Sequence, residues 1–332
     1  MDLRQSPEGE KLLSEVATFI ESYIEPNQRT FAEQMAASGD PHFHPPVLEE
    51  LKDKAKEQGL WNMFLPHLDP DEPGSKLSNV DYAYIAEKLG RNGFASEVFN
   101  CSAPDTGNME LLHLYGTDEQ KERWLYPLLN GEIRSSFAMT EPAVASSDAT
   151  NIETRIDSDN DDYVINGRKW FISGAESARC KLFILMGKTD VDASRHRQQS
   201  MILIPRSHPG VTLEASPTVF GYEDRGGHPQ LLFSDVRIPK NEGLLGEEGG
   251  GFAMSQARLG PGRIHHCMRS LGVAELALEL MCQRAVSRNT FGKPVIQQGL
   301  IQDWIAEARL GIDQARLMCL YTASLMDTVG NK

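Results

Sequence analysis

The strongest constraint on the fold is the hydrophobic periodicity of the chain, which changes character twice. From about residue 14 to residue 130, apolar residues recur at helical spacing. The middle of the chain instead carries short β-branched and aromatic runs between turn residues, and helical spacing then returns. The sequence therefore predicts an α+β protein of three parts: an N-terminal α-helical domain over 1–130, a middle β-barrel-like domain over 131–247 and a C-terminal helical domain over 248–332.

Five runs in the middle part have the composition of β-strands. They are rich in β-branched and aromatic residues, which suit a pleated and half-buried surface. Asp159–Asp162 and Asn166–Gly167 are predicted hairpin turns. No helix-length periodic segment separates the runs, which favours an antiparallel sheet or barrel over a βαβ arrangement. The runs cover 154–156, 163–165, 182–186, 201–204 and 231–233.

Cap signals and long apolar stripes define the predicted helices. Asp81 is a predicted N-cap, and Thr117 with Gln120 is a predicted capping box. In the last part, one long helix is predicted to end near Arg288 and a second to run over about 298–326. Two such helices must bury their apolar faces against something. The C-terminal bundle is therefore predicted to be incomplete, and either a second chain or further residues complete it.

Composition argues against several classes of function. Lys and Arg total 33 against 47 Asp and Glu, a formal net charge of −14 that would repel a nucleic acid backbone. No run approaches the roughly 18 apolar residues of a membrane span, and the first residues resemble neither a secretory signal nor a transit peptide. The five cysteines are scattered and never form a C-x-x-C pair, so neither a metal site nor a disulfide framework is predicted.

Three glycine-rich places could be phosphate-binding loops or simple turns. They are Gly226–Gly227, Gly246–Gly251 and Gly260–Gly262. None carries the G-x-G-x-x-G of a dinucleotide fold or the G-K-[ST] of a P-loop. Turns are the favoured interpretation, so a nucleotide cofactor would need another kind of site.

Two polar segments are candidates for such a site. Residues 137–148 are dense in Ser and Thr, a pattern that by itself indicates a turn with local hydrogen bonds. The segment Lys169–Gly174 sets Trp170 and Phe171 beside the Ser173 hydroxyl. A planar heterocycle needs this combination for stacking and hydrogen bonding. Together the two segments predict a site for a flat cofactor.

Three ordered motifs give the chain a family resemblance. They are Phe137–Pro142 with Ser147-Asp148, Ile165–Lys169 with Ile172–Gly174, and Arg288–Lys293. In this order and spacing they resemble the acyl-CoA dehydrogenase family, from the first helices to the end of the chain. The stretches Val144–Asn151 and Arg258–Arg269 are most similar to the subgroup that in animals is fused to an aminoglycoside-phosphotransferase-like kinase domain. The resemblance implies the family's fold, FAD as cofactor and an acyl-CoA as substrate.

The resemblance also implies which residues hold FAD. Thr140 would hydrogen-bond the pyrimidine edge of the flavin, Ser173 would donate to flavin N5, and either Trp170 or Phe171 would stack on the ring. Ser147 would meet the acyl chain near its thioester end. The implied FAD-binding residues of these two segments are Phe137, Ala138, Met139, Thr140, Ser146, Ser147, Trp170, Phe171, Ile172 and Ser173.

A site shared between subunits is a further implication. Taken alone, Arg288 is a cation that complements a helix C-terminus. In the family the matching Arg, here followed by Thr290 and Phe291, reaches the FAD diphosphate of a neighbouring protomer, where a guanidinium suits paired phosphate oxygens. A homodimer or homotetramer is therefore expected. The implied substrate-binding residues are Ser147, Gly260 and Arg263.

The implied reaction is the α,β-dehydrogenation of an acyl-CoA thioester to a trans-2-enoyl-CoA, a step of fatty acid β-oxidation in lipid metabolism. A carboxylate with a raised pKa removes the α proton. In most of the family this base lies beyond the position of Lys332, and the alternative position matches Gly262, which has no side chain. Glu141, Asp148 and Glu275 do not match the base. Residues 1–332 are therefore predicted to lack it and to be catalytically silent by themselves.

Other interpretations stay open at this point. An acyl-CoA oxidase shares the fold and the flavin, and a non-catalytic flavoprotein that binds DNA shares the fold, although the net charge opposes it. The resemblance implies electron-transfer flavoprotein as electron acceptor and, through the subgroup, long-chain or 4-hydroxyacyl substrates. It implies a cytoplasmic location in a bacterium and a mitochondrial or peroxisomal one in a eukaryote. Chain length, the base and the choice between dimer and tetramer stay open.

Overall fold

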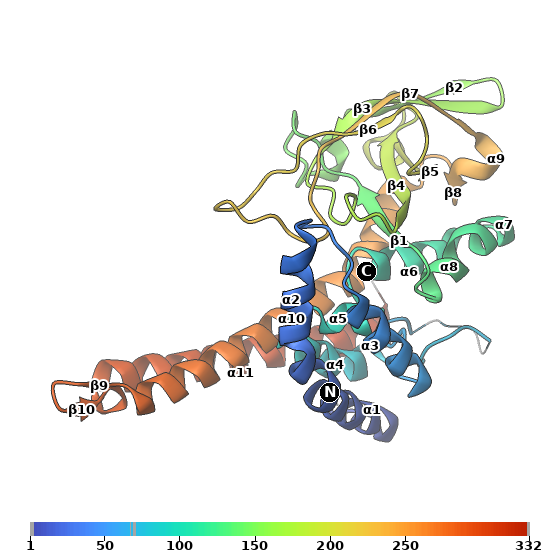
Figure 1. The fold of residues 1–332 in the computed structure, drawn as a ribbon. Coiled ribbons are helices and arrows are strands. Elements are labelled where there is room, and N and C mark those ends of the chain that lie inside the picture. Colours follow the sequence, from blue (N-terminus) through green and yellow to red (C-terminus); the bar gives the residue numbers. More distant parts are fainter. Residues whose placement is uncertain (1–2, 67, 69–70, 331–332) are drawn as a thin grey trace. The chain divides into compact units, whose positions relative to one another are not determined.

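A computed structural model describes residues 3–66, 68 and 71–330 (Figure 1). It confirms the order of helices, then a β-sheet, then two long helices. The first helices are α1 (Pro7–Phe19), η1 (Ile20–Ile24), α2 (Glu25–Ser38), α3 (Pro46–Glu57), α4 (Asn79–Gly90), α5 (Ala95–Val98), α6 (Asp105–Tyr115), α7 (Asp118–Gln120), η2 (Lys121–Leu125) and α8 (Tyr126–Leu129). The last elements are α10 (Gly251–Ser287), β9 (Asn289–Thr290), β10 (Lys293–Pro294), η5 (Val295–Gln297) and α11 (Gly299–Val329).

The chain divides into two compact units. The first contains Met1–Gln28, Glu50–Cys101 and Gly260–Lys332, and the second contains Arg29–Glu49 and Ser102–Leu259. In the first unit α4 contacts both α1 and α11, and its buried side chains form part of a helical core. Every helix in the described part of the chain is too short or too polar to cross a membrane.

The helix starts test the predicted caps. The prediction for Asp81 is wrong, because the N-cap of α4 is Ser78, whose Oγ accepts from the Asp81 N–H at 3.0 Å. Asp81 lies in the first turn, where its carboxylate accepts from the Ser6 N–H at 2.7 Å. Ser and Asp are equally good caps, and the prediction did not consider Ser78, three residues before Asp81. The capping box of Thr117 and Gln120 is confirmed.

Gly272 marks a close approach between α10 and α4. A Cβ on Gly272 would overlap the carbonyl oxygen of Glu87, which is a backbone atom and cannot move away by a rotamer change. We expect Gly272→Ala to destabilise the protein by about 1–3 kcal/mol through overpacking, measured as the free energy of unfolding in urea. Gly311→Ala on α11 is the control, since its Cβ would enter open space. Equal stabilities of the two variants would contradict the close approach.

The second unit is built around an eight-stranded sheet. Its order is β6-β7-β3-β2-β4-β5-β8, and β1 pairs with β4. Alternate residues of these strands, such as Phe183 and Leu185 or Ile202 and Ile204, are buried in one core. The strands are β1 (Arg134–Ala138), β2 (Arg155–Asp159), β3 (Asp162–Lys169), β4 (Cys180–Lys188), β5 (Gln199–Pro205), β6 (Val211–Leu213), β7 (Leu231–Pro239) and β8 (Leu244–Leu245); the short helices are η3 (Ala149–Asn151), η4 (Arg195–Arg197) and α9 (Lys240–Gly243).

The sheet corrects two sequence expectations. It is mixed rather than purely antiparallel, because β4 runs parallel to β1 after the β2–β3 hairpin has turned the chain back. Asn166–Gly167 is not a hairpin turn but lies inside β3, at a register shift opposite β7. The Asn166 side chain bonds Asp235 of β7 there, so cross-strand pairing overrides the local turn signal. The turn at Asp159–Asp162 is confirmed and joins β2 to β3.

Candidate functional site

The two polar segments predicted to form one site lie side by side. Thr140 follows β1 and Trp170 follows β3. The Trp170 N–H donates to the Thr140 carbonyl at 3.0 Å, and the Thr140 hydroxyl donates to the Trp170 carbonyl at 2.7 Å. This reciprocal pair joins the segments. Because its hydroxyl proton is already used, the Thr140 oxygen is left to act as an acceptor.

Lys169 ties the same loop to the sheet. Its buried ammonium donates to the Glu141 carboxylate at 2.7 Å and to the carbonyls of Met139 at 2.8 Å and Met186 at 2.6 Å. Burial lowers the pKa of Lys169 to about 8, while Glu141 acts in the opposite direction. Burial would raise the pKa of Glu141, but Lys169 and Thr154 hold it below its ordinary value. The pair is therefore charged at neutral pH and fixes Met139–Glu141.

Trp170 and Phe171 form an aromatic surface next to this loop. Their ring centroids lie 4.3 Å apart with the planes inclined by 43°. Phe171 is 50% exposed and has a φ of 53°, which residues other than glycine rarely adopt. Backbone strain of this kind concentrates at ligand sites. Phe171 is the more exposed of the two rings.

Ser146 and Ser147 have different environments. The Ser146 Oγ accepts from the Glu141 N–H at 2.8 Å and donates to the Glu141 carbonyl at 3.1 Å, which closes the turn. Ser147 is exposed. Asp148 caps η3 by accepting from the Thr150 N–H at 3.0 Å. Of the two serines, Ser147 is therefore the one placed to meet a ligand with its side chain.

Other predicted cofactor-binding residues are part of the core. Ala138 and Ile172 are buried in the sheet, so they can contribute backbone groups but no side-chain contact. Phe137 is half-buried, and the Arg258 guanidinium lies over its ring, 4.0 Å from the centroid. These three residues therefore support the segments from inside.

Buried Glu110 and half-buried Arg258 influence each other electrostatically, and sequence reasoning missed both. The Arg258 Nε donates to Asn108 Oδ1 at 3.0 Å. Burial raises the pKa of Glu110 to about 8, although Arg258 opposes the shift, and burial lowers the pKa of Arg258 to about 10 against the effect of Glu110. A signal was present, since Glu110 stands inside the apolar run of α6, where a carboxylate is rarely buried without a partner.

The raised pKa of Glu110 makes stability depend on pH. Between pH 4.5 and pH 8 the folded protein holds a proton on Glu110 that the unfolded chain has lost, so stability falls as the pH rises through this window. Glu110→Gln removes that loss. From about pH 6 to about pH 9, the free energy of unfolding of the variant, measured in urea, should rise relative to that of wild type by on the order of 2 kcal/mol. A difference that does not change with pH would contradict the burial of an ionisable Glu110.

Ser173 meets a histidine outside both segments. Its Oγ lies 3.0 Å from His228 Nδ1, and His228 Nε2 lies 3.3 Å from Asp224 Oδ2. His228 follows Gly226–Gly227 in the loop between β6 and β7. The glycine pair was predicted from the sequence to form a turn, but His228, which directly follows it, was not predicted to belong to the site.

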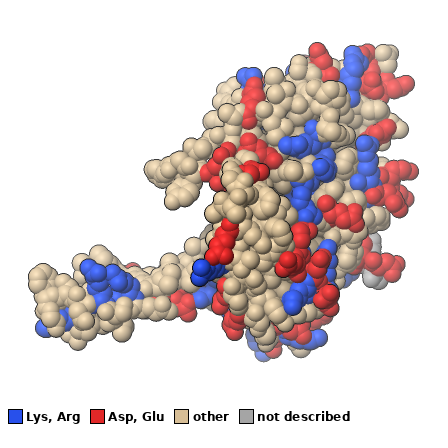
Figure 2. Space-filling model, in the orientation of Figure 1, with Lys and Arg blue, Asp and Glu red and all other residues tan. Residues whose placement is uncertain are grey.

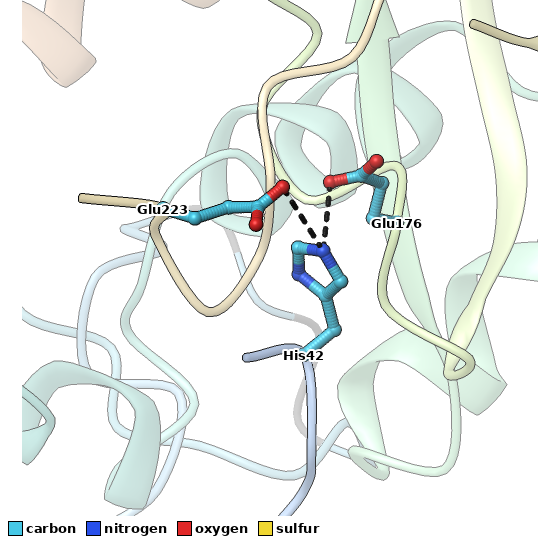
Figure 3. A group of neighbouring side chains, drawn as sticks. All are labelled: His42, Glu176 and Glu223. Atoms are coloured by element: carbon cyan, nitrogen blue, oxygen red, sulfur yellow. Dashed lines mark ion pairs between the residues drawn. The ribbon is translucent and has the colours of Figure 1, made fainter. Parts of the chain in front are cut away.

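His42 fastens the same loop to the segment between α2 and α3 (Figure 3). Its Nε2 lies 3.0 Å from Glu176 Oε2 and 3.6 Å from Glu223 Oε1, and its Nδ1 lies 3.0 Å from the Arg225 carbonyl oxygen. These contacts hold the loop that carries His228.

Arg288, Thr290 and Phe291 lie at the far end of the hairpin formed by α10 and α11. Phe291 is 98% exposed, and Arg288 is also exposed. Figure 2 shows Lys and Arg gathered near this tip, while most of the hairpin surface in that view carries no charge. The two helices expose large apolar side chains, which are suited to packing against other helices. These include Val273, Leu280, Val286, Leu300, Trp304, Leu310, Leu317 and Met318.

The predicted substrate residues of α10 differ in exposure. Gly260 is buried, whereas Arg263 is exposed. His265, two residues further on, is buried against the Tyr82 ring at 4.6 Å between centroids. Burial lowers the pKa of His265 to about 3, so it is a neutral core residue.

Comparison with known proteins finds one family over the whole chain. Profiles of the N-terminal, middle and C-terminal domains of acyl-CoA dehydrogenases match residues 6–132, 136–236 and 249–332. Acyl-CoA dehydrogenase family member 11 of Gallus gallus is 54% identical over 99% of this chain, which spans 42% of that relative's length. The acyl-CoA dehydrogenase FadE2 of Mycobacterium tuberculosis is 51% identical over 100% of this chain, which spans 80% of that protein.

Solved structures agree with the sequence comparisons. An acyl-CoA dehydrogenase from Mycobacterium abscessus superposes with a TM-score of 0.93 at 46% identity, covering 98% of this chain and 82% of its own. Glutaryl-CoA dehydrogenase, solved with glutaryl-CoA, superposes with a TM-score of 0.80 at 25% identity, covering 98% of this chain and 78% of its own. The chain therefore belongs to the acyl-CoA dehydrogenase family, a family of flavoprotein oxidoreductases whose cofactor is FAD.

Proposed function

We propose that the protein is an FAD-dependent acyl-CoA dehydrogenase that forms a trans-2-enoyl-CoA. The reciprocal bonds between Thr140 and Trp170 carry the proposal, because they bring an acceptor oxygen, two aromatic rings and the exposed Ser173 hydroxyl together. This set fits a flavin: the rings can stack on it, the Thr140 oxygen can accept from its N3–H, and Ser173 can meet N5. FAD, when bound, supplies the hydride acceptor.

The proposed substrate is an acyl-CoA thioester. Ser147, exposed beside the Glu141 turn, and Arg263, exposed on α10, are the side chains we assign to it, with the backbone of Gly260. Long-chain or 4-hydroxyacyl chains, which the subgroup resemblance implies, are the proposed acyl groups. Electron-transfer flavoprotein is the proposed electron acceptor, and the exposed apolar hairpin supports a homodimer or homotetramer.

Three carboxylates considered as the base are engaged elsewhere. Glu141 is paired with Lys169. The Thr150 hydroxyl lowers the pKa of Asp148, and the Arg309 guanidinium lowers that of Glu275. A base that takes an α proton works best with a raised pKa. With Gly262, which has no side chain, at the alternative position of the base, we propose that residues 1–332 alone turn over acyl-CoA poorly or not at all.

The visible spectrum of the full-length protein tests the proposal. Yellow protein that bleaches on addition of a long-chain acyl-CoA without oxygen would support FAD, substrate class and an intact base together. Colourless protein would contradict the FAD site. Yellow protein that does not bleach would contradict the substrate class.

Two further measurements separate the alternative functions. Rapid reoxidation of the bleached flavin in air would identify an acyl-CoA oxidase, since a dehydrogenase passes its electrons to another protein. Retention on heparin at moderate salt would favour a DNA-binding flavoprotein, which the net charge of −14 opposes.

A further inference from the structure

Two short segments hold His228 opposite Ser173. Residues 172–176 and 226–229 run antiparallel, and three backbone bonds join them: Ile172 N–H to Pro229 at 3.2 Å, Gly174 N–H to Gly227 at 3.0 Å and Glu176 N–H to Gly226 at 3.2 Å. Gly227 has a φ of 64°, and a Cβ there would overlap the Glu176 carboxylate. Glycine is therefore required at this point of the loop, and the pairing leaves little freedom in where His228 lies.

Hydrogen bonds fix the His228 ring as well as its backbone. The His228 N–H donates to Ser216 Oγ at 2.9 Å, and the Ser216 hydroxyl donates to Glu176 Oε2 at 2.9 Å. On the ring, Nδ1 faces the Ser173 hydroxyl at 3.0 Å and Nε2 faces the Asp224 carboxylate at 3.3 Å. A carboxylate beside Nε2 favours the tautomer with its proton on Nε2. Nδ1 then accepts, and the Ser173 hydroxyl donates to it.

We propose that His228 is a positioning residue that sets the direction of the Ser173 hydroxyl proton at the flavin. The inference rests on the proposed function, which puts Ser173 beside flavin N5. Since its proton is turned toward His228, Ser173 presents an oxygen lone pair to the ligand, instead of the donor to N5 that the family resemblance implies. Reduced flavin carries a proton on N5 and can donate to that lone pair, whereas oxidised flavin offers only an acceptor there. The pair Ser173 and His228, with Asp224 behind them, therefore favours reduced FAD.

A double-mutant cycle on the FAD-bound protein tests whether His228 acts through Ser173. The readout is the ratio of reduced to oxidised flavin at a fixed potential, read from the visible spectrum in equilibrium with a reference dye. We expect His228→Ala and Ser173→Ala each to lower this ratio roughly fivefold, the size of one hydrogen bond. The double variant should match Ser173→Ala, because His228 has no route to the flavin except through that hydroxyl.

Conservative variants separate this role from a structural one. His228→Asn keeps an acceptor near the position of Nδ1 and should restore the wild-type ratio. Asp224→Asn should lower the ratio by less than His228→Ala, since Asp224 is 64% exposed. Thr218→Ala, in the same loop and exposed, is the matched control and should leave the ratio unchanged.

The outcomes distinguish this inference from the proposed function. Wild-type protein that holds no FAD would overturn both. Protein that holds FAD normally but shows an unchanged ratio in His228→Ala would overturn the role of His228 alone. Additive effects in the double variant would do the same, because they would show that His228 acts on the flavin by a path other than Ser173.

Discussion

Lys169→Met is expected to destabilise the protein by about 3–5 kcal/mol, because it leaves the buried Glu141 carboxylate without its counter-charge. The Glu141 side chain is 4% exposed and that of Lys169 is 0% exposed, so water cannot replace the lost partner. The carbonyls of Met139 and Met186 lose their donor at the same time. Urea unfolding of the purified variant measures the effect.

Two further variants show whether the effect of Lys169→Met comes from the loss of the buried ion pair. Lys181→Met is the matched control, since Lys181 is exposed on β4, and it should change the stability by no more than about 0.5 kcal/mol. Lys169→Met combined with Glu141→Gln removes both charges and should be more stable than Lys169→Met alone. If Lys169→Met is as stable as the control, the pair does not hold the loop.

The same variant connects stability to the cofactor. Lys169 bonds the carbonyl of Met139, which directly precedes Thr140, so its loss frees the loop that Thr140 shares with Trp170. We therefore expect Lys169→Met to lose FAD during gel filtration, whereas Lys181→Met retains it. Full retention of FAD by Lys169→Met would separate the buried pair from the flavin site.

Long-range periodicity predicted the fold well, and local signals predicted it less reliably. The helical stripes after residue 250 place the end of α10 within one residue, at Ser287 rather than Arg288, because a stripe sums over many positions. The turn predicted at Asn166–Gly167 was wrong. The dipeptide favours a turn by itself, but hydrogen bonds to a neighbouring strand stabilise the extended conformation instead. Pairing of Asn166 with Asp235 depends on β7, 69 residues later, and no local pattern contains that information.

In the candidate site, too, some residues could be predicted from the sequence and others could not. Thr140 and Trp170 belong to the two polar segments that could be recognised in the sequence, and the structure joins them. His228 and Glu110 belong to neither segment. His228 matters through the contact of one ring nitrogen with Ser173, and Glu110 through its burial. Contacts between a loop and a distant turn follow from sheet register, which composition does not specify. Residues that position other residues are therefore the ones that sequence reasoning misses.

Arg288→Ala is expected to weaken FAD binding by about 30-fold or more, the size of a charge-assisted hydrogen bond, while stability changes by no more than about 0.5 kcal/mol. Arg288 is exposed beyond the end of α10, so its loss leaves no cavity in its own chain. The FAD dissociation constant, measured by flavin fluorescence, gives the first value and urea unfolding the second. Arg284→Ala, one turn earlier and also exposed, is the control. Equal losses in both variants would point to general charge rather than to Arg288.

Mixed oligomers test whether Arg288 serves the FAD of a neighbouring subunit. Trp170→Ala with Phe171→Ala removes both stacking rings, so such a subunit should hold no FAD by itself but keeps a normal Arg288. Arg288→Ala subunits keep the rings. In a mixed oligomer, the rings of one subunit meet the intact Arg288 of the other. We therefore expect FAD at about half the sites of mixed oligomers purified after co-expression, although each variant alone binds little. Mixed oligomers that stay colourless would show that Arg288 acts within its own chain, because each flavin site would then lack one essential group.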